Sequence, residues 1–118
     1  MNTVTLNQKR FQLQDIPTRL NHLAAHLDQI QSLILTGTDS DTVVSLMRES
    51  RYYIEWIVPE FVDIDVDSSA ELVDLGRVLT RWLFNWEKIW VDTDSRTEVA
   101  QITSGLSERV REISKVAS

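Results

Sequence analysis

The chain has no cysteine, three glycines and two prolines among its 118 residues. Without cysteine it can form no disulfide framework, no thiolate nucleophile and no cysteine-ligated zinc site. So few glycines and prolines leave little material for the turns of a multi-stranded sheet, and they exclude a glycine-rich phosphate loop. Nucleotide-binding α/β folds are therefore not expected.

Positive charge and long apolar runs are also scarce. The formal net charge is -6, so a protein that binds a phosphate backbone through clustered lysine and arginine is not expected. No stretch approaches the ~20 apolar residues that cross a bilayer, and the amino terminus lacks the layout of a signal peptide. We expect one soluble, acidic, cytoplasmic domain spanning residues 1–118, with no nucleic-acid or membrane partner.

Apolar residues recur at alternating steps of three and four in four segments, which is the spacing of helices that pack on other helices. The first helix is predicted to be capped by Asp15, to hold Pro17 in its first turn and to stop at Gly37. Its apolar seam is Leu13, Ile16, Leu20, Leu23, Leu27, Ile30 and Ile34. Residues 1–14 are expected to form a docked arm, since Phe11 lies off this seam. Thr5 and Gln8 could cap a short helix within the arm.

The other three helices are predicted from their end signals and seams. The second should cover residues 41–58 and end at Pro59. Two capping boxes, Ser68 with Glu71 and Ser95 with Glu98, are predicted to open the third and fourth. The third seam is Leu72, Leu75, Leu79, Trp82, Trp86 and Ile89, and the fourth is Val99, Ile102, Leu106, Ile113 and Val116.

Short breaks between long helices favour antiparallel neighbours. The predicted fold is therefore all-α, an antiparallel up-down-up-down four-helix bundle with an N-terminal arm. An elongated coiled-coil dimer of two helical hairpins would use the same seams.

The acidic break from Asp63 to Asp74 resembles an EF-hand calcium loop in the spacing of its carboxylates. Ser68 stands where that loop needs glycine, and Asp74 replaces the long bidentate glutamate. Acids that precede a helix also favour its positive N-terminal end. We therefore predict that these acids are helix caps, and we expect neither a metal nor another cofactor.

His22 and His26 are four residues apart, so on a helix both imidazoles could reach one metal. Leu23 stands where a metalloprotease helix carries its glutamate base, and the pair is predicted to be partly exposed beside the core. Arg19 and His26 resemble the Arg-then-His spacing of HEPN-type ribonucleases, although Leu20 stands where that family carries a polar residue. No catalytic residue is assigned, and an enzyme is not expected.

Several aromatic residues fall outside the seams. On the second helix, Tyr52 and Trp56 lie one turn apart on the side opposite the seam, near Arg48. On the third, Phe84 lies with Val73, Gly76, Thr80 and Val91 on the side opposite Trp82, Trp86 and Trp90. Aromatic and arginine side chains are typical anchors of protein contacts.

These outward residues give the main functional hypothesis. Arg48, Tyr52, Trp56, Val73 and Phe84 are predicted to bind a protein partner or a second copy of the chain, in a non-enzymatic interaction module. The arm with Phe11 could instead cover some of them. The alternative hypothesis is a small-ligand- or metal-dependent protein, or even an enzyme, with a site at His22 and His26 or in the bundle core.

Overall fold

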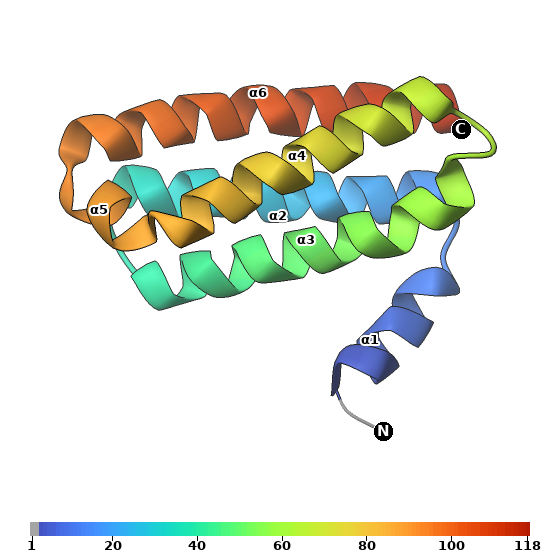
Figure 1. Ribbon diagram of the computed structural model, residues 1–118, viewed down its shortest axis with the longest axis horizontal. Helices are drawn as coiled ribbons and strands as arrows, with labels where there is room; N and C mark the ends of the chain where they lie inside the picture. The colour runs from blue at the N-terminus through green and yellow to red at the C-terminus, as the bar shows by residue number, and fades with distance from the viewer. Residues whose placement is uncertain (1–2) are drawn as a thin grey trace.

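The computed structural model describes residues 3–118, which form six α-helices and no strand (Figure 1). The helices are α1 (Thr3–Gln12), α2 (Ile16–Thr36), α3 (Ser40–Phe61), α4 (Val66–Phe84), α5 (Trp86–Val91) and α6 (Thr93–Ala117). This confirms the all-α prediction. In the described part of the chain, none of the helices combines the length and the apolar character needed to span a bilayer.

The four long helices lie side by side, and α2 packs against both α6 and α3 (Figure 1). α4 packs along α3 and runs between α3 and α6 in the view of Figure 1, and the short α5 joins it to α6 at one end of the molecule. α1 packs against α3 near the start of α2. The core therefore runs between the long helices, with α1 as an addition to one side.

The ends of α2 follow the prediction. The carboxylate of Asp15 accepts a hydrogen bond from the Thr18 N–H at 2.9 Å, and Gly37 ends the helix at a φ of 66°, a conformation that favours glycine. The buried apolar residues of α2 are at most 1% exposed: Leu20, Leu23, Ala24, Leu27, Ile30 and Ile34. Leu13 was predicted wrongly, because it lies in the turn before α2 and is 87% exposed.

α6 packs against α2, and four of its seven buried residues are small: Ala100, Thr103, Ser107 and Ser114. The Ser107 hydroxyl donates to the Ala24 carbonyl at 3.3 Å and the Ser114 hydroxyl to the Pro17 carbonyl at 3.0 Å. Buried serines that bond to carbonyls in this way add little bulk and leave no polar atom unpaired, so the two backbones can approach closely. The larger Ile102 and Val116 are exposed instead, and their place in the predicted fourth seam is wrong.

Pro59 does not end α3, contrary to the prediction. It lies inside the helix, which continues to Phe61, a residue only 1% exposed. A proline removes one helical N–H and crowds the preceding turn. Burial of Phe61 in the core offsets that loss, since a buried phenyl ring contributes about 1.5–3 kcal/mol.

The N-terminal ends of several helices lie earlier than predicted. Asp39 and Asp65 cap α3 and α4 through side-chain bonds to the N–H groups of Thr42 and Ser68. α6 begins at Thr93 and α1 at Thr3, so Ser68, Ser95 and Thr5 lie within helices and are not caps, contrary to the prediction. The prediction that the acids of the break before α4 act as helix caps is confirmed for Asp65. The aspartates take the cap positions because their carboxylates accept backbone N–H bonds more strongly than serine hydroxyls do.

The third predicted helix is divided at Asn85 into α4 and α5. Trp82 and Trp86 are both buried, as predicted. The Trp86 indole N–H donates to the Ser40 hydroxyl at 2.9 Å, and the Trp90 ring lies against the Arg96 guanidinium. This aromatic group closes the α5 end of the molecule.

We expect acid to weaken the link between α2 and α6. Asp28 accepts hydrogen bonds from Arg111 and Ser107, and the bond from Arg111 is the main cause that lowers the pKa of Asp28. A carboxylate whose pKa is lowered on folding stabilises the protein above its ordinary pKa, about 4. That stabilisation is lost as the pH falls through the lower native value, because the unfolded chain binds the proton first.

Asp28→Asn should therefore lower the free energy of unfolding by about 1 kcal/mol at pH 7, the size expected for a half-exposed pair, and by much less at pH 3. Urea unfolding at the two pH values measures this. Asp63→Asn, which changes an exposed carboxylate without a hydrogen-bond partner in residues 3–118, is the control. An equal loss at both pH values would contradict the assignment.

Candidate functional site

Phe11 fixes α1 to the rest of the molecule. Its ring is 6% exposed and stacks on Tyr53, with the ring centroids 4.4 Å apart and the planes 7° from parallel. The Trp56 ring lies 5.7 Å from Phe11. α1 therefore packs against α3 through the Phe11 ring.

An ion pair between a buried arginine and an exposed glutamate lies at one end of this aromatic contact. Arg19 on α2 is 4% exposed, and its guanidinium binds both carboxylate oxygens of Glu60 on α3, at 2.5 and 3.2 Å. The same guanidinium donates to the Gln14 carbonyl at 2.8 Å and lies 5.9 Å from the Phe11 ring. The hydrogen bond from Arg19 lowers the pKa of Glu60. Arg19 thus joins α2, α3 and the turn after α1.

His26 occupies the other end of the same contact. Its Nε2 lies 2.8 Å from a carboxylate oxygen of Glu49 on α3, and its ring meets Tyr53 edge-on at 4.8 Å. Arg19 and His26 are therefore each held by a glutamate of α3, with Phe11 and Tyr53 between them. Both residues of the ribonuclease-like spacing have structural partners. His22 is exposed and lines the cavity described next.

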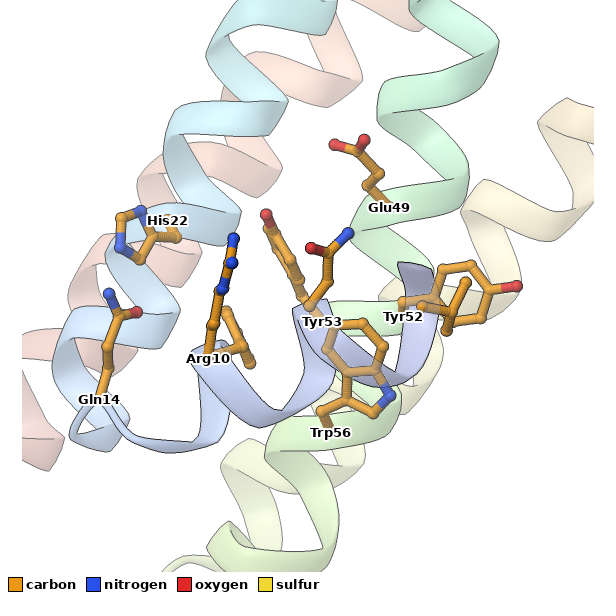
Figure 2. A pocket seen from close by; sticks show the side chains of 10 residues that line it. Arg10, Gln14, His22, Glu49, Tyr52, Tyr53 and Trp56 are labelled. Carbon is orange, nitrogen blue, oxygen red and sulfur yellow. The ribbon is translucent and has the colours of Figure 1, made fainter. Parts of the chain in front are cut away.

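A cavity of about 490 Å³ lies between α1, α2 and α3 (Figure 2). α1 and the turn after it contribute five residues, among them Arg10, Phe11 and Gln14. α2 contributes His22, and α3 contributes Glu49, Tyr52, Tyr53 and Trp56. Figure 2 shows the Arg10 side chain extending beside Tyr53 into the space between α2 and α3, with His22 on the opposite wall and Glu49 further along α3. The cavity joins an aromatic wall to several convergent polar groups.

Three of these polar side chains are unpaired. Within residues 3–118, the Arg10 guanidinium, the Gln14 amide and the His22 imidazole have no hydrogen-bond or ion-pair partner. Burial, and secondarily the nearby Glu49, raise the pKa of Tyr53, so its hydroxyl stays protonated and can donate. Arg10 and Gln14 were not predicted from the sequence, because the direction in which residues 1–14 dock is not encoded in a local pattern. The off-seam Phe11 was the one signal.

Of the five predicted partner-binding residues, four are exposed and one is buried. Arg48, Tyr52, Val73 and Phe84 are exposed, and Phe84 is 89% exposed. Trp56 is only 8% exposed, so its outward placement was wrong. The Phe11 ring covers Trp56, which is the alternative left open by the sequence. The Trp56 ring also stacks on Tyr52, with the ring centroids 5.5 Å apart.

A second hollow, a groove of about 420 Å³, lies between α3 and α4. Its apolar lining is Ile54, Val58, Pro59, Val73 and Gly76, and Thr80 adds a hydroxyl. Gly76 was predicted to lie on the outer side with Phe84, but a Cβ on Gly76 would meet Ile54 at 3.8 Å. Gly76 therefore faces α3 and forms the floor of the groove. Arg51, Glu55 and Arg77 also line it.

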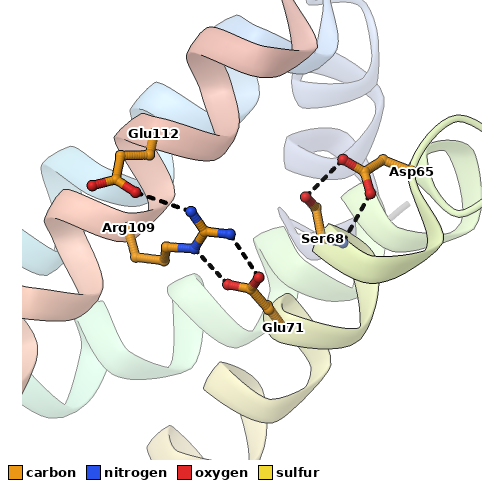
Figure 3. A network of polar contacts seen from close by, with 5 residues as sticks. All are labelled: Asp65, Ser68, Glu71, Arg109 and Glu112. Carbon is orange, nitrogen blue, oxygen red and sulfur yellow. Dashed lines mark hydrogen bonds and ion pairs between the residues drawn. The ribbon is translucent and has the colours of Figure 1, made fainter.

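Figure 3 shows how the acidic break before α4 is used. Asp65 accepts bonds from the Ser68 N–H and hydroxyl, and Glu71 forms a paired contact with Arg109 of α6 (Figure 3). Nowhere in residues 3–118 do three or more His, Asp or Glu side chains come together as metal ligands. The chain matches no protein-family model, no curated protein and no solved structure. The cavity and the groove are therefore the two candidate functional sites in the described part of the chain.

We expect Phe11→Ala to release α1 while the long helices stay folded. The substitution removes the ring that stacks on Tyr53 of α3, and truncating a buried phenylalanine to alanine, which also leaves a cavity, typically costs about 3–5 kcal/mol. Hydrogen exchange should show loss of protection confined to residues 3–12, and iodide should quench Trp56 fluorescence more strongly.

Leu13→Ala is the control for this experiment, because Leu13 is 87% exposed and its side chain contributes little. Loss of protection throughout α2 and α3 in Phe11→Ala would show that α1 is an integral part of the core, against the expectation of independent docking.

Proposed function

We propose that this chain is a non-enzymatic interaction module that pairs with a second copy of itself through the groove between α3 and α4. In this proposal α2, α3, α4 and α6 act as an up-down-up-down four-helix bundle that carries α1 as its arm. The observation that supports it best is Phe84, a large aromatic ring that is 89% exposed on α4. An exposed ring of this size beside an apolar groove is typical of an interaction surface.

Phe84 belongs to the same stripe of α4 that forms one wall of the groove. Val73, Arg77 and Thr80 line the groove, and Phe84 follows Thr80 by one turn, so the four residues lie along one side of the helix. The stripe therefore has a hollow at one end and a projecting ring at the other.

A surface with both features can complement itself under twofold symmetry. Gly76 and Phe84 each lie about 6 Å along the helix from Thr80, at a rise of 1.5 Å per residue. If two α4 helices pack antiparallel with the symmetry axis near Thr80, the Phe84 ring of each copy lies over the Val73–Gly76 end of the other. The groove of about 420 Å³ is large enough for a phenyl ring.

The remaining predicted residues extend this surface. Arg51 and Glu55 line the groove and also a neighbouring hollow on α3 that includes Arg48 and Tyr52. The exposed predicted residues are thereby connected across α3 and α4. Because arginine and tyrosine are enriched at protein contacts, they are suitable for the rim around the apolar groove.

The area available implies a weak dimer. Two phenylalanine rings bury ~300–500 Å², which corresponds to ~8–12 kcal/mol before other terms. Association opposes this with ~4–15 kcal/mol of lost freedom. The pairing should therefore depend on concentration and be measurable at high micromolar protein.

A small-ligand-binding protein is the second candidate function. The cavity beneath α1, with its unpaired Arg10, Gln14 and His22 side chains, supports it. This candidate uses a different surface from the groove, and the two functions are compatible in one molecule.

We expect Phe84→Asp to abolish self-association. The substitution replaces the projecting ring with a charge that would have to enter an apolar groove, so the dissociation constant should rise by at least ~100-fold, the effect of a lost contact of about 3 kcal/mol. Sedimentation velocity over a concentration series up to about 1 mM measures the change, and circular dichroism checks that the variant stays folded.

Leu13→Asp is the matched control, since Leu13 is 87% exposed, almost as much as Phe84, and lies outside the groove. It should retain the wild-type mass distribution. A wild-type chain that stays monomeric up to 1 mM, or a Phe84→Asp variant that pairs like the wild type, would rule out this interface.

A further inference from the structure

The cavity beneath α1 has the composition of a small-molecule site. Its volume of about 490 Å³ lies within the range of ligand pockets, which are mostly apolar hollows with a few convergent polar groups. Phe11, Tyr53 and Trp56 supply the aromatic part, and Arg10, Gln14 and His22 supply the polar part (Figure 2). These residues come from α1, the turn after it, α2 and α3.

Hydrogen-bond donors outnumber free acceptors in this cavity. The Arg10 guanidinium carries five N–H groups, the Gln14 amide two, and the Tyr53 hydroxyl one. Glu49 is the one carboxylate among the lining residues, and one of its oxygens is already held by His26 at 2.8 Å. An arginine without an ion-pair partner in residues 3–118, beside an occupied carboxylate, favours an anion over a cation.

The aromatic side chains indicate which class of anion fits the cavity. Phe11 covers one side of Tyr53, while Trp56 keeps 8% of its surface exposed at the edge of the cavity. Flat apolar walls of this kind bind planar rings through offset or edge contacts. A guanidinium binds a carboxylate through two parallel N–H bonds, so a ring and a carboxylate together match both parts of the cavity.

We propose that the cavity between α1, α2 and α3 binds a small aromatic carboxylate, with its carboxylate on Arg10 and its ring against Tyr53 and Trp56. Gln14 and His22 also line the cavity and are the further donors to the carboxylate. Tyr53 presents its protonated hydroxyl at the boundary between the polar and aromatic parts. The proposal is independent of the α4 interface, because none of these residues lines the α3–α4 groove.

The test compares three probes that divide the proposed ligand into its parts: sodium phenylacetate, sodium acetate and phenethylamine hydrochloride. Each is titrated into the ¹⁵N-labelled full-length chain and followed by ¹H–¹⁵N NMR spectra. Phenylacetate should give saturable shifts at the amides of Arg10, His22 and Tyr53 and at the Trp56 indole N–H. Its dissociation constant should be millimolar or tighter, as expected for so small a ligand. Acetate, which lacks the ring, and phenethylamine, which carries the opposite charge, should each bind at least ~10-fold more weakly.

Arg10→Gln should weaken phenylacetate binding at least ~10-fold, since it removes the charge but keeps a side chain that can form hydrogen bonds. Lys9→Gln is the matched control: it removes the neighbouring cation of α1, which does not line the cavity, and should bind like the wild type. His22→Gln should weaken binding less than Arg10→Gln does. Well-dispersed spectra for each variant confirm that it is folded.

Three results would overturn the proposal: no saturable shift with phenylacetate, wild-type affinity in Arg10→Gln, or phenethylamine binding as tightly as phenylacetate. Equal shifts with acetate would show a surface anion contact without a ring site, and would also overturn it. Phe84→Asp should bind phenylacetate normally, and Arg10→Gln should self-associate normally, so failure at one surface is distinguishable from failure at the other.

Discussion

The close contact between α2 and α6 is the constraint on which the rest of the arrangement depends. Buried serines of α6 bond to carbonyls of α2, and the apolar face of α2 is almost fully covered. Because α6 occupies one side of α2, α3 packs on another, and α4 reaches the core mainly across α3. The side of α2 and α3 away from α6 is thereby left to α1.

α3 consequently borders more than one hollow, and consecutive tyrosines lie where they meet. Tyr53 and Tyr52 both line the α1 cavity, and Tyr52, which is 39% exposed, also lines the hollow shared with Arg48 and Arg51. The Trp56 ring lies near Phe11 and stacks on Tyr52. The two surfaces with a proposed role are thus neighbours on one helix, although they share no charged residue that either proposal depends on.

Structural features that depend only on neighbouring residues in the sequence could be predicted correctly. The Asp15 cap, the Gly37 stop and the apolar face of α2 could be predicted because capping, left-handed backbone and helical periodicity are properties of nearby residues. The predictions failed where a distant contact outweighed the local signal. Burial of Phe61 carries α3 past Pro59, and bonds to α2 place serines of α6 where larger apolar residues were expected.

The candidate site shows the same division. Helical periodicity alone predicts that Tyr52, Val73 and Phe84 are exposed, and they are 39%, 38% and 89% exposed. Trp56 has the same periodicity as Tyr52, and only the position of Phe11 distinguishes the two. The role of Arg10 depends entirely on how α1 docks, which no pattern within residues 1–14 determines.

The stacking of Phe11 on Tyr53 has a consequence for the first helix. α1 and the turn after it supply about half of the cavity wall, so the cavity exists only in molecules in which α1 is docked. Docking of α1 and occupancy of the cavity are therefore thermodynamically linked: any occupant adds its binding free energy to the docked state by mass action. The fraction of molecules in which α1 is docked should therefore rise when the cavity is occupied and fall when it is empty.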